Sequence, residues 1–321
     1  MTEIALLAGR TAGPAGPSAS TWKPASRREL VVLALYFAGL ITLTDIINVR
    51  PGVEVMTLAV ALAAICISRQ PRPFLHDWWF LLAGLIMWNL SGAIAAHSPV
   101  QPHLDFMLKA DRALLLGRDP VVVVQKALAH AGQVGPLDVL TAIVYNLHLP
   151  EPYIVGYFLW RISRQAYVQF AAAALILLVV GFLTFVLFPA VPPWLAAERY
   201  GQVTSVFNGY NQVLRWYPMP FHGTPIFYVF KLTGDAVAAF PSEHAAFPLL
   251  ECLALASCTR RRVWLWLVLW VLAVLFTVVY LGEHWVTDAL AGYAYAVLIW
   301  VLVRRFTGQI RNGVSLPAPR G

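Results

Sequence analysis

Apolar runs long enough to cross a lipid bilayer recur along this chain, and they limit what it can fold into. Eight such runs fall at about 30–48, 54–68, 78–96, 138–160, 166–189, 240–259, 263–282 and 285–303. A transmembrane helix needs roughly 20 apolar residues. Of the 321 residues, 59% are hydrophobic and only 12% are charged, whereas a soluble domain is about one-quarter charged. The sequence therefore predicts an all-α fold, a polytopic membrane bundle of about eight transmembrane helices.

One membrane domain accounts for most of the chain. Residues 1–28 are rich in Ala, Gly, Pro, Ser and Thr and end in a pair of arginines, which predicts a disordered cytoplasmic tail. Residues 29–305 form a single transmembrane domain in this interpretation, and 306–321 form a second cytoplasmic tail. Between the third and fourth runs, mixed charged and apolar residues predict an interfacial amphipathic helix near 100–120.

Basic clusters next to the apolar runs set the predicted orientation. They comprise Lys23, Arg27 and Arg28; Arg69 and Arg72; Arg161 and Arg164; Arg260, Arg261 and Arg262; and Arg304, Arg305 and Arg311. With eight spans and a cytoplasmic N-terminus, every inside connection carries one cluster, as the positive-inside rule expects. Both termini are then cytoplasmic, in a plasma or inner membrane. The net charge of +7 is explained by topology, and we expect no nucleic-acid partner.

Two histidine motifs fall at the outer ends of predicted spans. Pro241-Ser242-Glu243-His244 opens the sixth run, and His284 precedes Asp288 by four residues at the start of the eighth. Residues four apart lie on one face of a helix, so the carboxylate could fix the imidazole tautomer and free the other nitrogen. Ser242 is placed to cap a helix whose N-terminus could hold an anion. A phosphate there could be attacked by one histidine while the other protonates the leaving oxygen.

Each of these pieces has an ordinary structural role when it occurs alone. A His-x-x-x-Asp pair is often structural, and a serine before a helix is a common cap. Two ligands are too few for a metal site, so we predict neither a metal nor another cofactor. The motifs lie in segments poor in polar residues, however, where ionisable groups are costly and usually functional. Their shared predicted depth favours a catalytic site.

These two motifs resemble the type 2 phosphatidic acid phosphatase superfamily over about 240–292. The first is Pro-Ser-Glu followed by His244, and the second runs from Tyr280 through His284 and Asp288 to Gly292. The resemblance implies a metal-independent enzyme that forms a phosphohistidine. Carried over by motif, His284 would be the nucleophile, Asp288 would orient it, and His244 would donate the proton to the leaving group.

The sequence departs from the usual superfamily pattern in its basic residues. The Ser-Arg pair before the second histidine is replaced by Thr277-Val278, and none of the four lysines begins the Lys-x6-Arg-Pro motif. Both losses resemble the branch that contains fungal inositol phosphorylceramide synthase. Further features similar to that branch extend the resemblance over about 105–300; they are Phe188 to Trp194, Tyr145 to His148 before Pro150, and Asp111-Arg112 with Gly117 and Pro120.

The missing arginines leave the phosphate charge without an obvious partner. A phosphoryl transition state needs positive or hydrogen-bonding groups. Our first candidate is Lys231 and our second is Arg215, both in the outer connection, followed by Arg199, Lys109 and Arg112. A single residue of this kind more often contacts solvent or a lipid headgroup, but we expect at least one of them to reach the phosphate. Tyr145 and His148, near the outer end of the fourth run, could bind the headgroup or make buried hydrogen bonds.

The sequence thus predicts an integral-membrane enzyme acting on a phospholipid or sphingolipid-like substrate at the extracytoplasmic face. Water as acceptor would make it a phosphatase. A hydroxyl acceptor, such as the polyol inositol, would make it a headgroup transferase, which the branch resemblance favours slightly. The alternative is a lipid-binding or transport protein that has kept the fold without turnover.

Overall fold

The computed structural model describes residues 76–81, 84, 100–147, 151–216 and 237–313. The predicted N-terminal tail, the first two predicted spans and most of the third lie outside these residues, as do Lys231 and His148. All structural statements below concern the described residues.

The described chain is almost entirely helical. Its helices are α4 (Asp105–Leu114), α5 (Pro120–Leu128), α6 (Pro136–Leu147), α7 (Glu151–Ile162), α8 (Arg164–Leu187), α9 (Pro193–Tyr200), α10 (Gly209–Trp216), α12 (Glu243–Ala256), α13 (Arg261–Tyr280) and α14 (Val286–Gly313). The described residues otherwise form two isolated β-bridges, from Ala190 to His103 and to Ala238. The prediction of an all-α fold is confirmed.

Three helices, α8, α13 and α14, are long and apolar enough to cross a membrane. They correspond to the fifth, seventh and eighth predicted runs. The sixth run forms the shorter helix α12. Parts of the fourth run form α6, which ends at Leu147, and α7, which begins at Glu151. The count of eight spans stays a prediction.

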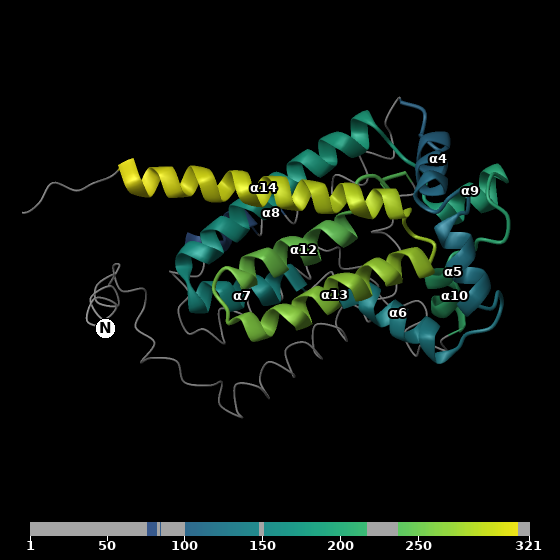
Figure 1. Ribbon diagram of the computed structural model, residues 1–321, viewed down its shortest axis with the longest axis horizontal. Coiled ribbons are helices and arrows are strands. Elements are labelled where there is room, and N and C mark those ends of the chain that lie inside the picture. Colours follow the sequence, from purple (N-terminus) through teal and green to yellow (C-terminus); the bar gives the residue numbers. More distant parts are fainter. Residues whose placement is uncertain (1–75, 82–83, 85–99, 148–150, 217–236, 314–321) are drawn as a thin grey trace, which may run out of the picture.

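Helix α12 lies inside a lengthwise bundle (Figure 1). It packs against α7, α8, α13 and α14. Small and large apolar side chains fill the space between these helices, among them Phe170, Leu177, Leu250 and Trp300. Apolar burial of this kind contributes about 25 cal/mol per Å². α12 is therefore an enclosed helix, and what it carries is shielded by its neighbours.

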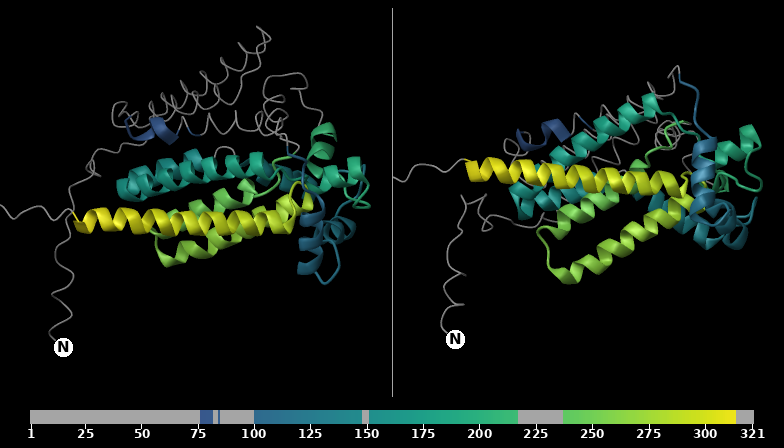
Figure 2. Two further views of the ribbon diagram at one scale, coloured as in Figure 1. Left: turned by 90° about the horizontal axis from the view of Figure 1, so that it is seen from above. Right: turned by 45° about the horizontal axis from the view of Figure 1, so that its top comes forward.

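Four shorter helices, α4, α5, α9 and α10, gather at the end of the bundle where α13 ends and α14 begins (Figures 1 and 2). α4 runs crosswise to α14 there. It buries Met107, Leu108 and Asp111 and exposes Phe106 and Leu114. α4 therefore has one buried and one exposed apolar face, and it lies within 100–120, where an interfacial amphipathic helix was predicted.

Backbone hydrogen bonds tie three distant segments together at this end. The amide of His103 donates to Pro189 O at 2.7 Å, Ala190 N donates to Val237 O at 2.8 Å, and Ala239 N donates to Ala190 O at 3.2 Å. The residues before α4, after α8 and before α12 are thereby held side by side. This connection fixes the carbonyl of Ala239, which the candidate site uses.

Candidate active site

The two motif histidines meet at the crowded end of the bundle. His244 is the second residue of α12, and His284 lies in the 281–285 loop just before α14. Nε2 of His284 is 3.0 Å from Nδ1 of His244, and the His284 side chain is buried. The structure thus brings together two side chains forty positions apart, in the pairing that the sequence predicts.

The hydrogen bonds of His284 determine its tautomer. Its Nδ1 lies 3.0 Å from the backbone carbonyl oxygen of Ala239. A carbonyl can only accept, so Nδ1 carries the hydrogen, and a neutral imidazole then has its lone pair on Nε2. That lone pair points at His244, whose Nδ1–H donates to it. His284 therefore turns its basic nitrogen toward His244, and this nitrogen becomes free once the hydrogen bond between the two rings opens.

Asp288 is fully buried in the first turn of α14. Its Oδ2 accepts a hydrogen bond from Trp285 N at 3.0 Å and lies 3.6 Å from Nδ1 of His284. Sequence reasoning gave Asp288 the role of fixing the tautomer. In the structure the Ala239 carbonyl makes the shorter contact with Nδ1, and the carboxylate adds a nearby negative charge.

Ser242 joins the starts of α12 and α14. Its Oγ accepts from Ala245 N at 3.3 Å, which makes it the N-cap of α12, and its own amide donates to Asp288 O at 2.9 Å. The two helices approach so closely here that a Cβ at Gly292 would clash with the Ser242 carbonyl oxygen. Ser242, predicted as a phosphate contact, is placed as a buried cap.

Asp111 of α4 holds the first turn of α14 from the other side. Its Oδ2 accepts from Val286 N at 3.0 Å, and its Oδ1 accepts from Thr287 N at 2.8 Å and from Thr287 Oγ1 at 2.6 Å. Burial raises the pKa of Asp111, and the hydrogen bonds from Thr287 and Val286 oppose that rise. A carboxylate is favoured at a helix N-terminus by unpaired amides and the helix dipole. Sequence reasoning noted Asp111 only as part of a resemblance and missed this role.

Tyr145 of α6 supports the ring of His244. The two rings stack with centroids 4.5 Å apart and planes 14° from parallel. Tyr210 of α10 packs against Tyr145, with ring centroids 4.9 Å apart. The predicted headgroup residue Tyr145 is therefore beside the histidine pair, where its ring limits how His244 can turn.

Glu283 places a carboxyl group next to His284 in the chain. Its Oε2 accepts from Trp194 Nε1 at 3.2 Å. Burial raises the pKa of Glu283 to about 7, against the lowering effects of His284, Trp194 and Asn208. Sequence reasoning assigned no role to this residue.

Three of the candidate cations are exposed or paired with a carboxylate. Arg112 is paired with Asp119, with Nε 2.7 Å from Oδ1. Lys109 is exposed, 4.0 Å from Asp105. Arg215 is exposed in the last turn of α10, the helix that carries Tyr210. No cluster of three or more His, Cys, Asp or Glu able to hold a metal occurs within the described ranges.

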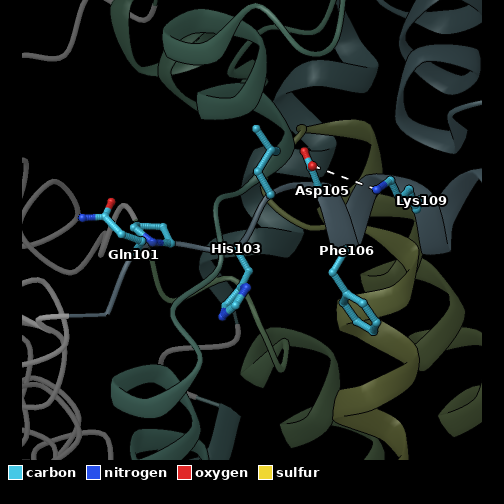
Figure 3. Close-up of a pocket in the computed structure, with 7 residues that line it drawn as sticks. Gln101, His103, Asp105, Phe106 and Lys109 are labelled. Carbon is cyan, nitrogen blue, oxygen red and sulfur yellow. Dashed lines mark ion pairs between the residues drawn. The ribbon is translucent and has the colours of Figure 1, made fainter.

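A surface pocket of about 560 Å³ lies beside the start of α4. It is lined by Gln101, Pro102, His103, Leu104, Asp105, Phe106 and Lys109. In Figure 3 the His103 and Phe106 side chains point away from the ion pair between Asp105 and Lys109. His103 stacks on Phe188 with ring centroids 3.9 Å apart. None of the lining residues belongs to the histidine site, so this pocket is distinct from that site.

Comparison with known proteins gives the arrangement a family. Residues 105–302, more than half of the chain, match the model described as the PAP2 superfamily. A phosphoinositol dihydroceramide synthase from Bacteroides thetaiotaomicron is 29% identical over 183 residues, which cover 54% of this chain and 58% of that protein. No solved structure matches. The family match includes Asp111, both histidines and Asp288, and the chain therefore belongs to the PAP2 superfamily.

Proposed function

We propose that this protein cleaves a lipid phosphoester through a phosphohistidine on His284 and passes the phosphoryl group to an acceptor hydroxyl. The observation that carries the proposal is the fixed tautomer of His284. Its Nδ1–H is tied to the Ala239 carbonyl, and its Nε2 lone pair faces His244 at 3.0 Å. A nucleophile beside an acid–base partner is the arrangement that covalent catalysis needs.

In the first step the hydrogen bond between the two histidines opens to admit the phosphate, and Nε2 of His284 attacks phosphorus. The bond from phosphorus to the leaving oxygen breaks as the nitrogen–phosphorus bond forms, and His244 donates its proton to that oxygen. The attacking imidazole becomes positively charged, and the carboxylate of Asp288, 3.6 Å from Nδ1, stabilises that charge. Tyr145, stacked on His244, keeps the acid oriented.

In the second step the acceptor hydroxyl attacks the phosphohistidine. The nitrogen–phosphorus bond breaks, a phosphorus–oxygen bond forms, and the acceptor proton passes to His244. The similar Bacteroides protein is named for a product that joins phosphoinositol to dihydroceramide, which favours transfer over hydrolysis. The substrates we propose are a phospholipid donor and either a ceramide-type or a polyol acceptor such as inositol.

The proposed membrane position rests on the basic clusters beside the apolar runs. We propose that the site faces the extracytoplasmic side of a plasma or inner membrane and that both termini are cytoplasmic. Arg215 and Lys231 are the residues we propose for binding the phosphate charge. No metal takes part in this scheme.

The test uses purified protein in detergent micelles with two labelled donors, phosphatidic acid and phosphatidylinositol. Each is supplied alone, with inositol, or with dihydroceramide. We expect His284→Ala to abolish product and to lose the labelled phosphoryl group trapped on wild-type protein. His244→Ala should slow turnover by roughly 10²–10⁴-fold, as loss of an acid–base group does. His103→Ala, a histidine change outside the site, is the matched control and should retain activity.

Unchanged product formation by His284→Ala would show that the mechanism is wrong. A wild-type protein that binds these lipids but turns over none of them would favour the lipid-binding or transport alternative.

A further inference from the structure

A carboxyl group beside a phosphoryl site needs an explanation. Glu283 directly precedes the proposed nucleophile, and an ionised carboxylate there would repel the phosphate of any donor. The contacts of His284 described above are made by Ala239, His244 and Asp288, so they do not account for a carboxyl group at position 283. A role for the carboxyl group itself is therefore the simplest physical account of its position.

The Glu283 side chain is held from two sides. Trp194, near the start of α9, donates its indole N–H to Oε2 at 3.2 Å, and its amide donates to Gly282 O at 3.0 Å. The Asn208 side chain also hydrogen-bonds the Glu283 carboxyl group. Asn208 Oδ1 accepts from Asn211 N at 2.7 Å, so the Asn208 amide group remains as the donor to Glu283. Two donors thus orient a carboxyl group that is only partly buried.

The protonation of Glu283 suits a site that first admits the phosphate of a donor and then binds a hydroxyl beside the phosphohistidine. Burial raises its pKa to about 7, so near neutral pH both forms are populated. The protonated form can stand beside a bound phosphoryl group without charge repulsion. The ionised form is a strong acceptor for a hydroxyl hydrogen.

We propose that Glu283, oriented by Trp194 and Asn208, binds a hydroxyl of the acceptor beside His284 and so selects acceptors that carry a diol. One hydroxyl of the diol attacks phosphorus and gives its proton to His244, while the second donates a hydrogen bond to the Glu283 carboxylate. Inositol and dihydroceramide share this diol chemistry. The inference rests on the proposed function and extends it to acceptor choice.

The experiment separates donor cleavage from transfer. Hydrolysis is measured without acceptor, and transfer is measured with each diol and with a one-hydroxyl analogue, namely cyclohexanol for inositol and 3-deoxydihydroceramide for dihydroceramide. For Glu283→Ala we expect the ratio of transfer to hydrolysis to fall by about 10–100-fold, the usual effect of losing a hydrogen bond to a charged group. The ratio, and not the absolute rate of hydrolysis, is the measured quantity, and the variant should use diol and one-hydroxyl acceptors equally well. The acceptor that Glu283 binds, inositol or dihydroceramide, is the one whose transfer falls in this variant.

A second variant keeps the shape of the site. Glu283→Gln can still accept from Trp194 but cannot ionise. Because the ionised form binds the hydroxyl, the wild-type ratio of transfer to hydrolysis should rise as pH increases through about 7, and the glutamine variant should lose this rise. Glu198→Ala, the same kind of change at an exposed position of α9, is the control and should match wild type in both assays.

Two outcomes would overturn this inference while leaving the proposed function intact. One is an equal loss of hydrolysis and transfer in Glu283→Ala, and the other is undiminished preference for diols in that variant. Failure of the proposed function looks different, because then His284→Ala resembles wild type or wild type forms no product.

Discussion

Two regions of the bundle, both built from apolar helices, differ in what surrounds them. The first is the α12–α14 contact, where Ser242, Asp288 and Gly292 lie buried. The second is the outward face of α13, where Leu265 and Trp266 are 63% and 70% exposed. Exposed apolar surface of that extent on a long apolar helix is typical of contact with lipid. The α12–α14 contact is enclosed by protein, whereas the α13 face exposes apolar side chains of the kind that contact lipid.

The difference shows where ionisable side chains can lie in a bundle of apolar helices. α13 is long and apolar enough to span a membrane, whereas α12 is shorter and is not among the candidate spans. Yet α12 carries Glu243, His244 and Glu251, which a lipid-facing helix could hold only at high cost. Enclosure by other helices permits these ionisable groups on α12. α12 therefore carries part of the site although it is not among the candidate spans.

The largest expected effect comes from forcing the α12–α14 contact apart. A Gly292→Leu change puts a side chain where even a Cβ would clash with the Ser242 carbonyl oxygen. Overpacking of a tight contact typically costs about 1–3 kcal/mol, occasionally more, and the shift would separate His244 from His284. We expect loss of product formation and a reduced yield of monodisperse protein in size-exclusion chromatography. Ala294→Leu, at an exposed position of α14, is the control; equal damage from both changes would contradict the close contact.

A smaller loss of product formation is expected when Asp111 no longer holds the first turn of α14. Asp111→Ala removes the acceptor for Val286 N, Thr287 N and Thr287 Oγ1. Leaving such donors unpaired should cost about 1–3 kcal/mol of unfolding free energy and lower turnover, because His284 immediately precedes this turn. Thermal unfolding followed by tryptophan fluorescence, together with the lipid assay, measures both. Asp105→Ala, an exposed carboxylate on the same helix, should change neither; a similar response would rule out a special role for Asp111.

The smallest effect is expected on the outward face of α13. Leu265→Ala removes a side chain that contacts little protein, so the unfolding free energy should change by less than about 0.5 kcal/mol. Leu250→Ala, inside the bundle, should cost about 2–5 kcal/mol. Parallel thermal melts compare the two. If Leu265→Ala is as damaging as Leu250→Ala, α13 packs on protein rather than lipid, for instance on a second copy of the chain.

The sequence was sufficient to predict the helical class and the meeting of His244 with His284. These follow from local patterns and from counting spans. It was not sufficient for Asp111 or Ala239, because their partners lie 175 and 45 positions away and nothing in a short motif announces a contact at that distance. Arg112 shows a further limit: the sequence placed it among the phosphate candidates without showing that Asp119, seven positions on, is its partner.

The backbone contact of His284 has a consequence for how this protein tolerates mutation. A carbonyl oxygen is present whichever amino acid occupies position 239, so no single substitution there deletes the group that holds the Nδ1 hydrogen. Only a change in the path of the chain can remove it, and the bonds between Ala190 and its neighbours resist such a change. The reactive form of the imidazole is thus protected against point mutation at its closest partner, while a carboxylate in that place could be lost in one step.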